Sequence, residues 1–273
     1  MLHSFTNGDG SAPEAIVIQG THGAIYGTTY YGGSLHLGTI FKLNADGNST
    51  LHTFSAGQFD GAYPAAELLE GSDGLLYVTT SSGGTNGSGA GVVFKMSKDG
   101  NGYTLLHSFV SSDGNNTQAG LVEGSDGALY GIAYGGGSAG LGTIFTLKKD
   151  GAGFSVIRSF IGPEGRSPSA RLLKQSNGVF YGTTFLGGGV NFGVVFQLLP
   201  PQTPDMISLS LVADGAQVSF SGVGGYQYSV LRSPDLNNWT VLSNITMPSI
   251  GFFTNVDAAF LPVAGFYRAA WVP

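Results

Sequence analysis

Residues 135–140 carry two overlapping patterns that could do chemistry. GGGSAG fits G-x-G-x-x-G, the pattern of a loop that cradles the pyrophosphate of a dinucleotide. Residues 136–140, GGSAG, also fit G-x-S-x-G, in which Ser138 would be the nucleophile of a hydrolase. Both chemistries need a strand followed by a turn and a helix. Here the glycines run into TIFTL, an apolar segment typical of a strand, so neither active site is supported.

The same stretch occurs four times along the chain. AIYGTTYYGGS at 24–34 returns as LLYVTTSSGGT at 75–85, ALYGIAYGGGS at 128–138 and VFYGTTFLGGG at 179–189. Ser138 is replaced by Ser34, Thr85 and Gly189 in the other copies, so the hydrolase pattern is not repeated. One tyrosine anchors each copy, with spacings of 51, 53 and 51 residues: Tyr26, Tyr77, Tyr130 and Tyr181. We therefore interpret the glycines as an interstrand loop of a tandem repeat.

Four strand-like segments make up each copy, and they predict the fold. In the first copy these segments are AIVIQG, IYGTT, GTIFKL and LHTF. Turns such as Asp46-Gly47 separate them. Four antiparallel strands in about 50 residues is the size of a propeller blade. The chain also begins with a fourth-type segment at residues 2–5, and the last copy stops after its third strand. We therefore predict an all-β fold with a four-bladed β-propeller whose N-terminal strand closes the last blade. A segment of a longer repeat array is the alternative.

A second domain follows the repeats. PPQTPD at 200–205 reads as a proline-rich linker, and the alternation ISLSLVADGAQVSFSG after it predicts further strands. The expected domains are a propeller at residues 1–199, the linker at 200–205, and a small immunoglobulin- or fibronectin-like sandwich at 206–273.

The composition argues against several classes of partner and site. A net charge of −6 with only 11 lysines and arginines argues against nucleic acid. No apolar run is long enough for a membrane-spanning helix, and residues 1–5 lack the basic start and apolar run of a signal peptide. With no cysteine, disulfides and thiolate metal sites are excluded.

At the repeated motifs the chain resembles the glycine-rich Gloeo/Verruco (GloVer) tandem repeat family. The resemblance covers residues 1–199 and rests on LYGTT, GG and GTIF-type segments and on the DG turns; Val78, Thr117 and Ile132-Ala133 depart from the pattern. It implies an exported, surface-anchored protein without a defined activity. The C-terminal region is similar to the small sandwich of many exported bacterial proteins.

The loop face of the predicted propeller is the candidate ligand site, because longer loops on a rigid scaffold commonly carry binding. One acidic position recurs beside each loop, and aromatic side chains lie near it: Asp9, Asp60, Asp113, Glu164, Tyr30, Tyr31, Tyr63, Tyr134, Phe185 and Phe192. Four acids around one axis would offer oxygen ligands to a Ca²⁺ ion, and no other cofactor is indicated. Their recurrence in every copy favours the simpler interpretation that each acid caps its own turn.

The resulting functional hypothesis is a non-catalytic extracellular or cell-surface binding or adhesion module, with polysaccharide as the candidate ligand. A structural repeat spacer is the first alternative. A polysaccharide-cleaving enzyme is the second, with Asp60 and Asp113 as the carboxylates to test. His3, His52, His107 and Arg158 share one repeat position, which we interpret as structural.

Overall fold

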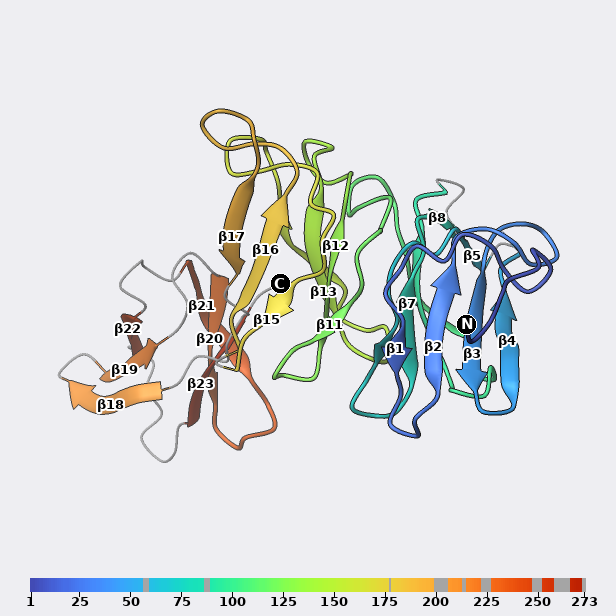
Figure 1. Cartoon of the computed structure of the whole chain (residues 1–273). Coiled ribbons are helices and arrows are strands. Elements are labelled where there is room, and N and C mark those ends of the chain that lie inside the picture. Colours follow the sequence, from blue (N-terminus) through green and yellow to red (C-terminus); the bar gives the residue numbers. More distant parts are fainter. Residues whose placement is uncertain are drawn as a thin grey trace. The chain divides into compact units, whose positions relative to one another are not determined.

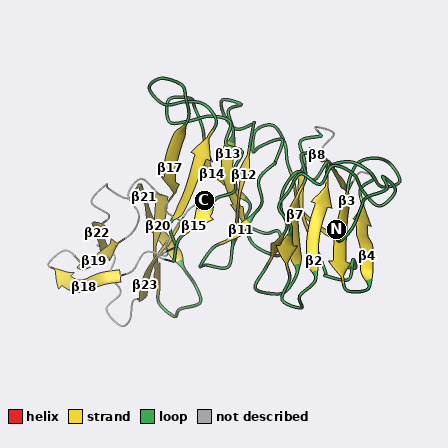
Figure 2. Ribbon diagram, in the orientation of Figure 1, coloured by secondary structure: helices red, strands yellow, loops and turns green. Residues whose placement is uncertain are grey.

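The computed structural model describes residues 1–55, 59–85, 89–176, 178–198, 206–212, 215–221, 227–246, 252–257 and 266–271. The chain divides into two compact units, Met1–Leu198 and Leu199–Pro273. Every regular element in these ranges is a β-strand, so the all-β prediction is confirmed (Figure 2). In these described ranges no helix is long and apolar enough to cross a membrane. The predicted linker at 200–205 lies outside the described residues.

The first unit consists mainly of four antiparallel sheets, one for each repeat (Figure 1). The first sheet contains β1 (Ile18–Gln19), β2 (Ile25–Thr29), β3 (Thr39–Asn44) and β4 (Gly47–Thr53). The second contains β6 (Leu69–Glu70), β7 (Leu76–Thr79), β9 (Val92–Met96) and β10 (Thr104–Ser108), and the third contains β11 (Val122–Glu123), β12 (Leu129–Ala133), β13 (Thr143–Leu147) and β14 (Ser155–Ser159). The fourth contains β15 (Leu173–Lys174), β16 (Phe180–Thr184) and β17 (Val194–Leu198).

The predicted closing strand does not form, and this part of the prediction is wrong. Residues 2–5 belong to no strand, and the fourth sheet has three strands. Instead, the ring of Phe5 packs edge-on against Phe41 of the first sheet, with 5.1 Å between centroids. In Figure 1 the first and fourth sheets lie at opposite sides of the unit. The N-terminal segment therefore stays with the first sheet, because its aromatic side chain finds an apolar surface there.

Consecutive sheets pack face to face. We call the face of a sheet that packs against the next sheet its trailing face, and the face that packs against the preceding sheet its leading face. We call the interface between two consecutive sheets a joint. At the first joint, Tyr26 and Ile40 of the first sheet share a core cluster with Leu68, Leu76 and Val78 of the second sheet. Equivalent clusters form the second and third joints. Strand alternation produces this arrangement, because successive side chains point to opposite faces of a sheet.

An ion pair also fastens the first joint. Glu70 on β6 accepts hydrogen bonds from the amide and hydroxyl of Thr21, at 3.1 and 2.8 Å, and from Lys98 Nζ at 2.6 Å. Burial opposes ionisation of Glu70, but the bonds from Lys98 and Thr21 outweigh it and lower the pKa of this carboxyl. Glu123 repeats the arrangement at the second joint with Ser72 and Lys149. The repeat thus encodes its own connection to its neighbour.

The second unit contains two three-stranded antiparallel sheets. One consists of β18 (Met206–Val212), β19 (Gly215–Ser221) and β22 (Phe252–Asp257), and the other of β20 (Gln227–Ser233), β21 (Thr240–Thr246) and β23 (Phe266–Trp271). Its core cluster is Val218, Phe220, Val230 and Ala269. Arg232 donates two hydrogen bonds to the Asp257 carboxylate, at 3.1 and 2.8 Å, and so links a strand of each sheet.

Candidate functional site

The glycine-rich loops lie at one end of the sheets, where a short bridge holds each loop to the turn with the acidic residue. Asn115 pairs with Gly135, and the other copies pair Ser11 with Tyr31, β5 (Gly61–Ala62) with β8 (Ser82–Gly83), and Arg166 with Leu186. Gly136 has a φ of +82°, and a Cβ atom there would lie 2.7 Å from the Cα atom of Gly114. This close backbone approach explains the glycines of residues 135–140 without catalysis.

The four acidic side chains each cap a local turn. The accepted backbone bonds are Thr6 N to Asp9 at 2.8 Å, Ser55 N to Asp60 at 2.9 Å, Val110 N to Asp113 at 2.9 Å, and Ile161 N to Glu164 at 3.1 Å. Among the described residues, no three histidine, aspartate or glutamate side chains form a group that could hold a metal ion. The geometry is that of turn capping repeated in every copy.

A basic side chain pairs with each of these acids, which the sequence analysis missed. The pairs are His3 with Asp9 at 2.8 Å, His52 with Asp60 at 3.1 Å, His107 with Asp113 at 3.1 Å, and Arg158 with Glu164 at 3.4 Å. A signal was present, because the fourth copy changes both members of the pair together. In that copy arginine (Arg158) replaces the histidine and glutamate (Glu164) replaces the aspartate, so the acid and the base remain paired.

Asp60 shows the electrostatics of this pair. Burial opposes its ionisation, but the hydrogen bond and charge of His52, with two bonds from Ser55, outweigh burial and lower the pKa of Asp60. Burial also raises the pKa of the nearby Tyr103 phenol, and the negative charge of Asp60 adds to the effect. A general acid needs a raised carboxyl pKa, so Asp60 is tuned for an ion pair rather than for proton donation.

Three of the predicted aromatic residues form a cluster at the loop end of the first joint. Tyr30 stacks on Tyr63 of the next repeat, with ring centroids 5.3 Å apart and planes 26° apart. Tyr31 meets both rings edge-on, at 4.7 Å from Tyr30 and 5.8 Å from Tyr63. Tyr31 is 48 % exposed. The cluster therefore presents an amphipathic aromatic surface to solvent.

The backbone of Tyr63 fixes this cluster. Tyr63 has a φ of +56°, which is uncommon for a residue with a bulky side chain. Its amide donates to Leu37 O at 2.8 Å, and its carbonyl accepts from Ser81 N at 3.2 Å. The other repeats hold Ala12, Asn116 and Ser167 in the same left-handed conformation. One bond to the preceding repeat and one within its own repeat thus hold Tyr63 in place, with its ring over Tyr30.

The remaining predicted aromatic residues lie apart from this cluster. Tyr134 follows β12 on the third sheet, and its amide donates to Asn116 O at 3.3 Å. Phe185 and Phe192 lie in the loop between β16 and β17 and are exposed. The repeat equivalents of Phe192 are Leu37, Ala90 and Leu141, which pack in the joints between sheets. Phe192 thus occupies a joint position for which the described part of Met1–Leu198 contains no next sheet.

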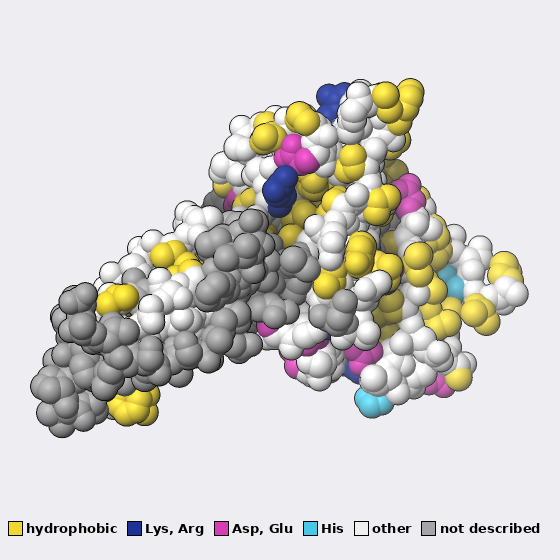
Figure 3. Space-filling model, turned by 90° about the vertical axis from the view of Figure 1, so that its left-hand side faces the viewer, with side chains coloured by type: hydrophobic (Ala, Val, Ile, Leu, Met, Phe, Trp, Pro, Cys, Tyr) yellow, Lys and Arg dark blue, Asp and Glu magenta, His cyan; other side chains and the backbone are white. Residues whose placement is uncertain are grey.

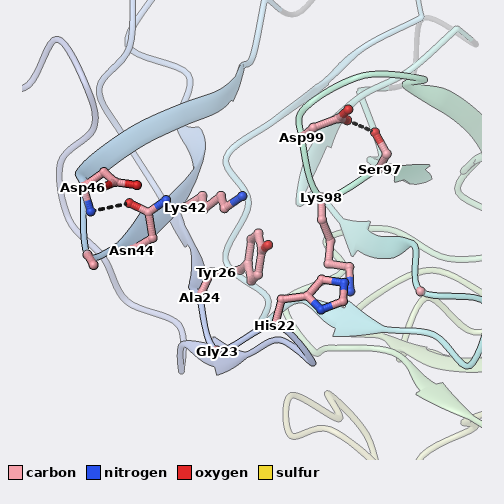
Figure 4. Close-up of a pocket in the computed structure, with 12 residues that line it drawn as sticks. His22, Gly23, Ala24, Tyr26, Lys42, Asn44, Asp46, Ser97, Lys98 and Asp99 are labelled. Atoms are coloured by element: carbon pink, nitrogen blue, oxygen red, sulfur yellow. Dashed lines mark hydrogen bonds between the residues drawn. The ribbon is translucent and has the colours of Figure 1, made fainter.

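A cleft of about 710 Å³ opens at the opposite end of the first two sheets, among the tight turns (Figure 4). His22, Tyr26, Lys42 and Lys98 line it, and Lys42 Nζ lies 5.9 Å from the centre of the Tyr26 ring. The sequence analysis treated these turns as structural. The sequence signal for this cleft was His22. In the next two copies the equivalent residues are Asp73 and Asp126, which accept hydrogen bonds from the hydroxyls of Tyr77 and Tyr130. Glu70 already neutralises Lys98, which weakens the cleft as an anion site.

Comparisons with known proteins give a family but no activity. The model of the Gloeobacter/Verrucomicrobia repeat matches residues 1–196 and 72–235. No curated protein matches the chain. Similar solved structures include the extracellular domain of a hybrid two-component system from B. thetaiotaomicron (11 % identity, 84 % of this chain, TM-score 0.46), of which this chain covers only 28 %. Another is an ulvan lyase, with 14 % identity and a TM-score of 0.44 over 85 % of this chain and 72 % of that one. A third is a xyloglucanase from Xanthomonas campestris, with 14 % identity and a TM-score of 0.44 over 89 % of this chain and 39 % of that one. At these scores the likeness assigns no substrate to this chain.

Proposed function

The chain belongs to the Gloeobacter/Verrucomicrobia repeat family, and from this premise we propose that it is a non-catalytic extracellular binding module. Its candidate ligand is a carbohydrate that lies against Tyr30, Tyr31 and Tyr63. The observation that carries the proposal is the packing of these rings, since two repeats build one aromatic surface that is half exposed at Tyr31. Aromatic faces pack against the apolar faces of sugar rings, while the phenol groups stay hydrated and can bond sugar hydroxyls.

Binding is favoured over cleavage by the surroundings of the acids. Asp60 and Asp113, the carboxylates to test for hydrolysis, each bond a histidine and a turn amide of their own repeat. Glycoside hydrolysis needs one carboxyl held protonated beside one that is ionised. The lowered pKa of Asp60 works against the first of these roles. We therefore give these acids a structural part in the module.

We also propose the finer reading of the architecture. The four sheets act as blades of a propeller-type array, and Leu199–Pro273 is an immunoglobulin- or fibronectin-like sandwich. Support comes from the four-stranded antiparallel sheets of the repeats and from the two three-stranded sheets that share one core cluster in the second unit. The extracellular setting rests on the family resemblance.

The test is binding to a panel of polysaccharides, with retained protein and new reducing ends measured together. We expect retention without new reducing ends. Tyr31→Ala should weaken binding about tenfold, or about 1.4 kcal/mol, because it removes the exposed ring of the cluster. Tyr31→Phe keeps the ring and should bind nearly as well as the wild type.

The control is Phe266→Ala, which removes an exposed aromatic side chain from the second unit. Equal binding by all three variants would place the ligand elsewhere. New reducing ends would show an enzyme, and failure of the wild type to bind any polysaccharide would favour the spacer alternative.

A further inference from the structure

Among the described residues of Met1–Leu198, no further sheet covers the trailing face of the fourth sheet. Val195 on β17 is 78 % exposed, whereas its repeat equivalents Ile40, Val93 and Ile144 are at most 2 % exposed inside the three joints. Further exposed side chains on this sheet and its loops are Leu173, Phe185 and Phe192. Figure 3 views the side of the molecule on which β15–β17 lie in Figure 1, and hydrophobic side chains gather there in a band.

The leading face of the first sheet is exposed in the complementary way. Val17 is 48 % exposed, whereas its equivalents Leu68, Leu121 and Leu172 are at most 2 % exposed. Ile25 is half-buried, although the equivalent side chains on β7, β12 and β16 are fully buried. One end of the array thus carries an uncovered trailing face, and the other an uncovered leading face.

Polar groups at these two ends also match the joints inside the chain. Thr28 Oγ1 donates to Ala66 O at 3.1 Å across the first joint, and Thr79 Oγ1 donates to Ala119 O at 3.2 Å across the second. The third joint has Ile132 at this position and so lacks the bond, whereas the fourth copy again has a threonine, Thr183, which is exposed on β16. The position equivalent to Ala66 and Ala119 on the first sheet is Ala15.

A backbone bond repeats at every joint as well. The amides of Tyr63, Asn116 and Ser167 donate to Leu37, Ala90 and Leu141 O, at 2.8, 3.1 and 2.8 Å. The next pair in this series is Ala12 N with Phe192 O. Ala12 already has the left-handed φ of +53° that the three donors share.

The edge of β17 is the last matching element. In the described part of the chain β17 pairs only with β16, whereas its equivalents β3, β9 and β13 each pair with a fourth strand. Residues 2–5 have the sequence of such a strand. Phe5 packs against Phe41 at 5.1 Å, as Phe54 at the end of the first sheet packs against Phe94 at 5.6 Å. The N-terminal segment is thus already placed as the end of a preceding sheet would be.

We infer that the trailing face of the fourth sheet binds the leading face of the first sheet of a second copy of this chain. The contact repeats the three internal joints, and residues 2–5 of the second copy supply the fourth strand beside β17. A second copy is favoured over the chain's own first sheet, because the two faces lie at opposite sides of the unit (Figure 1). Such a head-to-tail contact leaves a free face at each end and so allows chains of copies to grow.

Sedimentation velocity across a wide concentration range, with the full chain, tests the inference. Wild type should form dimers and larger species as concentration rises. Val195→Asp and Val17→Asp should each be monomeric, because either places a charge in the apolar contact. Each variant keeps one intact face, so an equimolar mixture of the two should form a dimer and nothing larger.

Val190→Asp is the matched control and should assemble like the wild type. Val190 is 74 % exposed, close to the 78 % of Val195. Its equivalent in the first repeat, Leu35, is 54 % exposed even though the second sheet covers the trailing face of the first sheet. This position therefore lies outside the joint. Circular dichroism should show the same fold for all variants. A monomeric wild type, or a mixture that stays monomeric, would overturn the inference. Variants that melt lower than a monomeric wild type would show that the face is covered within one chain.

Discussion

Each repeat uses one carboxylate for two local tasks. Asp60 accepts the amide of Ser55 and also bonds His52, so the end of one strand and the turn after it are held by a single side chain. Arg158 and Glu164 perform the same tasks in the fourth copy with longer side chains. The residues that first look catalytic therefore serve the turn, and in the proposed function the neighbouring tyrosines contact the ligand.

Asp60→Asn should lower the free energy of unfolding by about 1–2 kcal/mol, because it weakens hydrogen bonds of a carboxylate whose side chain is only 13 % exposed. Urea denaturation measures this loss. Polysaccharide binding should stay unchanged, since the Asp60 side chain holds the turn and not the ligand. Asp46→Asn, in an exposed hairpin turn, is the control and should have little effect. Loss of binding at wild-type stability would instead assign Asp60 to the ligand site.

Between elements, the first two joints combine an apolar core with an ion pair at the end where the tight turns lie. Glu70 and Glu123 each bond the turn of the preceding sheet and a lysine of their own. The fourth sheet has Lys174 at this position, and it donates to Glu123 O at 2.9 Å instead. Sequence analysis predicted the strands, because alternation and turns are local signals. It missed these contacts, since a glutamate beside a strand reads the same whether or not a lysine 28 residues away reaches it.

The stability of the joints should depend on pH. The pKa values of Glu70 and Glu123 lie below the usual 4.5 in the folded chain, because the bonds from lysine and hydroxyl groups outweigh the cost of burial. The folded state then binds fewer protons than the unfolded state, so the contribution is complete above pH 4.5 and is lost as the pH falls through the folded pKa values. Urea denaturation at a series of pH values should show a shallower acid loss for Glu70→Gln/Glu123→Gln than for wild type. Glu14→Gln, an exposed carboxyl, should keep the wild-type slope.

At the scale of the molecule, two units have separate cores. As far as the residues are described, the clusters that join the four sheets consist of residues of the first unit, and the cluster of the second unit is Val218, Phe220, Val230 and Ala269. Repetition in the sequence predicted the four equivalent sheets. The closing strand was predicted wrongly, because the repeat pattern states which faces are complementary and not whether they meet within one chain.

Calorimetry should therefore show two unfolding transitions for the full chain. A fragment ending at Leu198 should reproduce one of them within a few degrees, because Met1–Leu198 is a compact unit with core clusters of its own. A single transition that moves when the second unit is removed would show that the units are coupled. The intact chain at the same concentration serves as the reference for this measurement.

The left-handed residue at each joint has a consequence for engineering. Ala12, Tyr63, Asn116 and Ser167 adopt the same backbone conformation with four unrelated side chains. At three of these positions the amide donates to a carbonyl of the preceding repeat, and the carbonyl accepts from an amide of its own repeat. Because the backbone makes the attachment, no particular side chain is needed for it. This position is a natural site for randomisation in a library, with one variable residue per repeat on a constant scaffold.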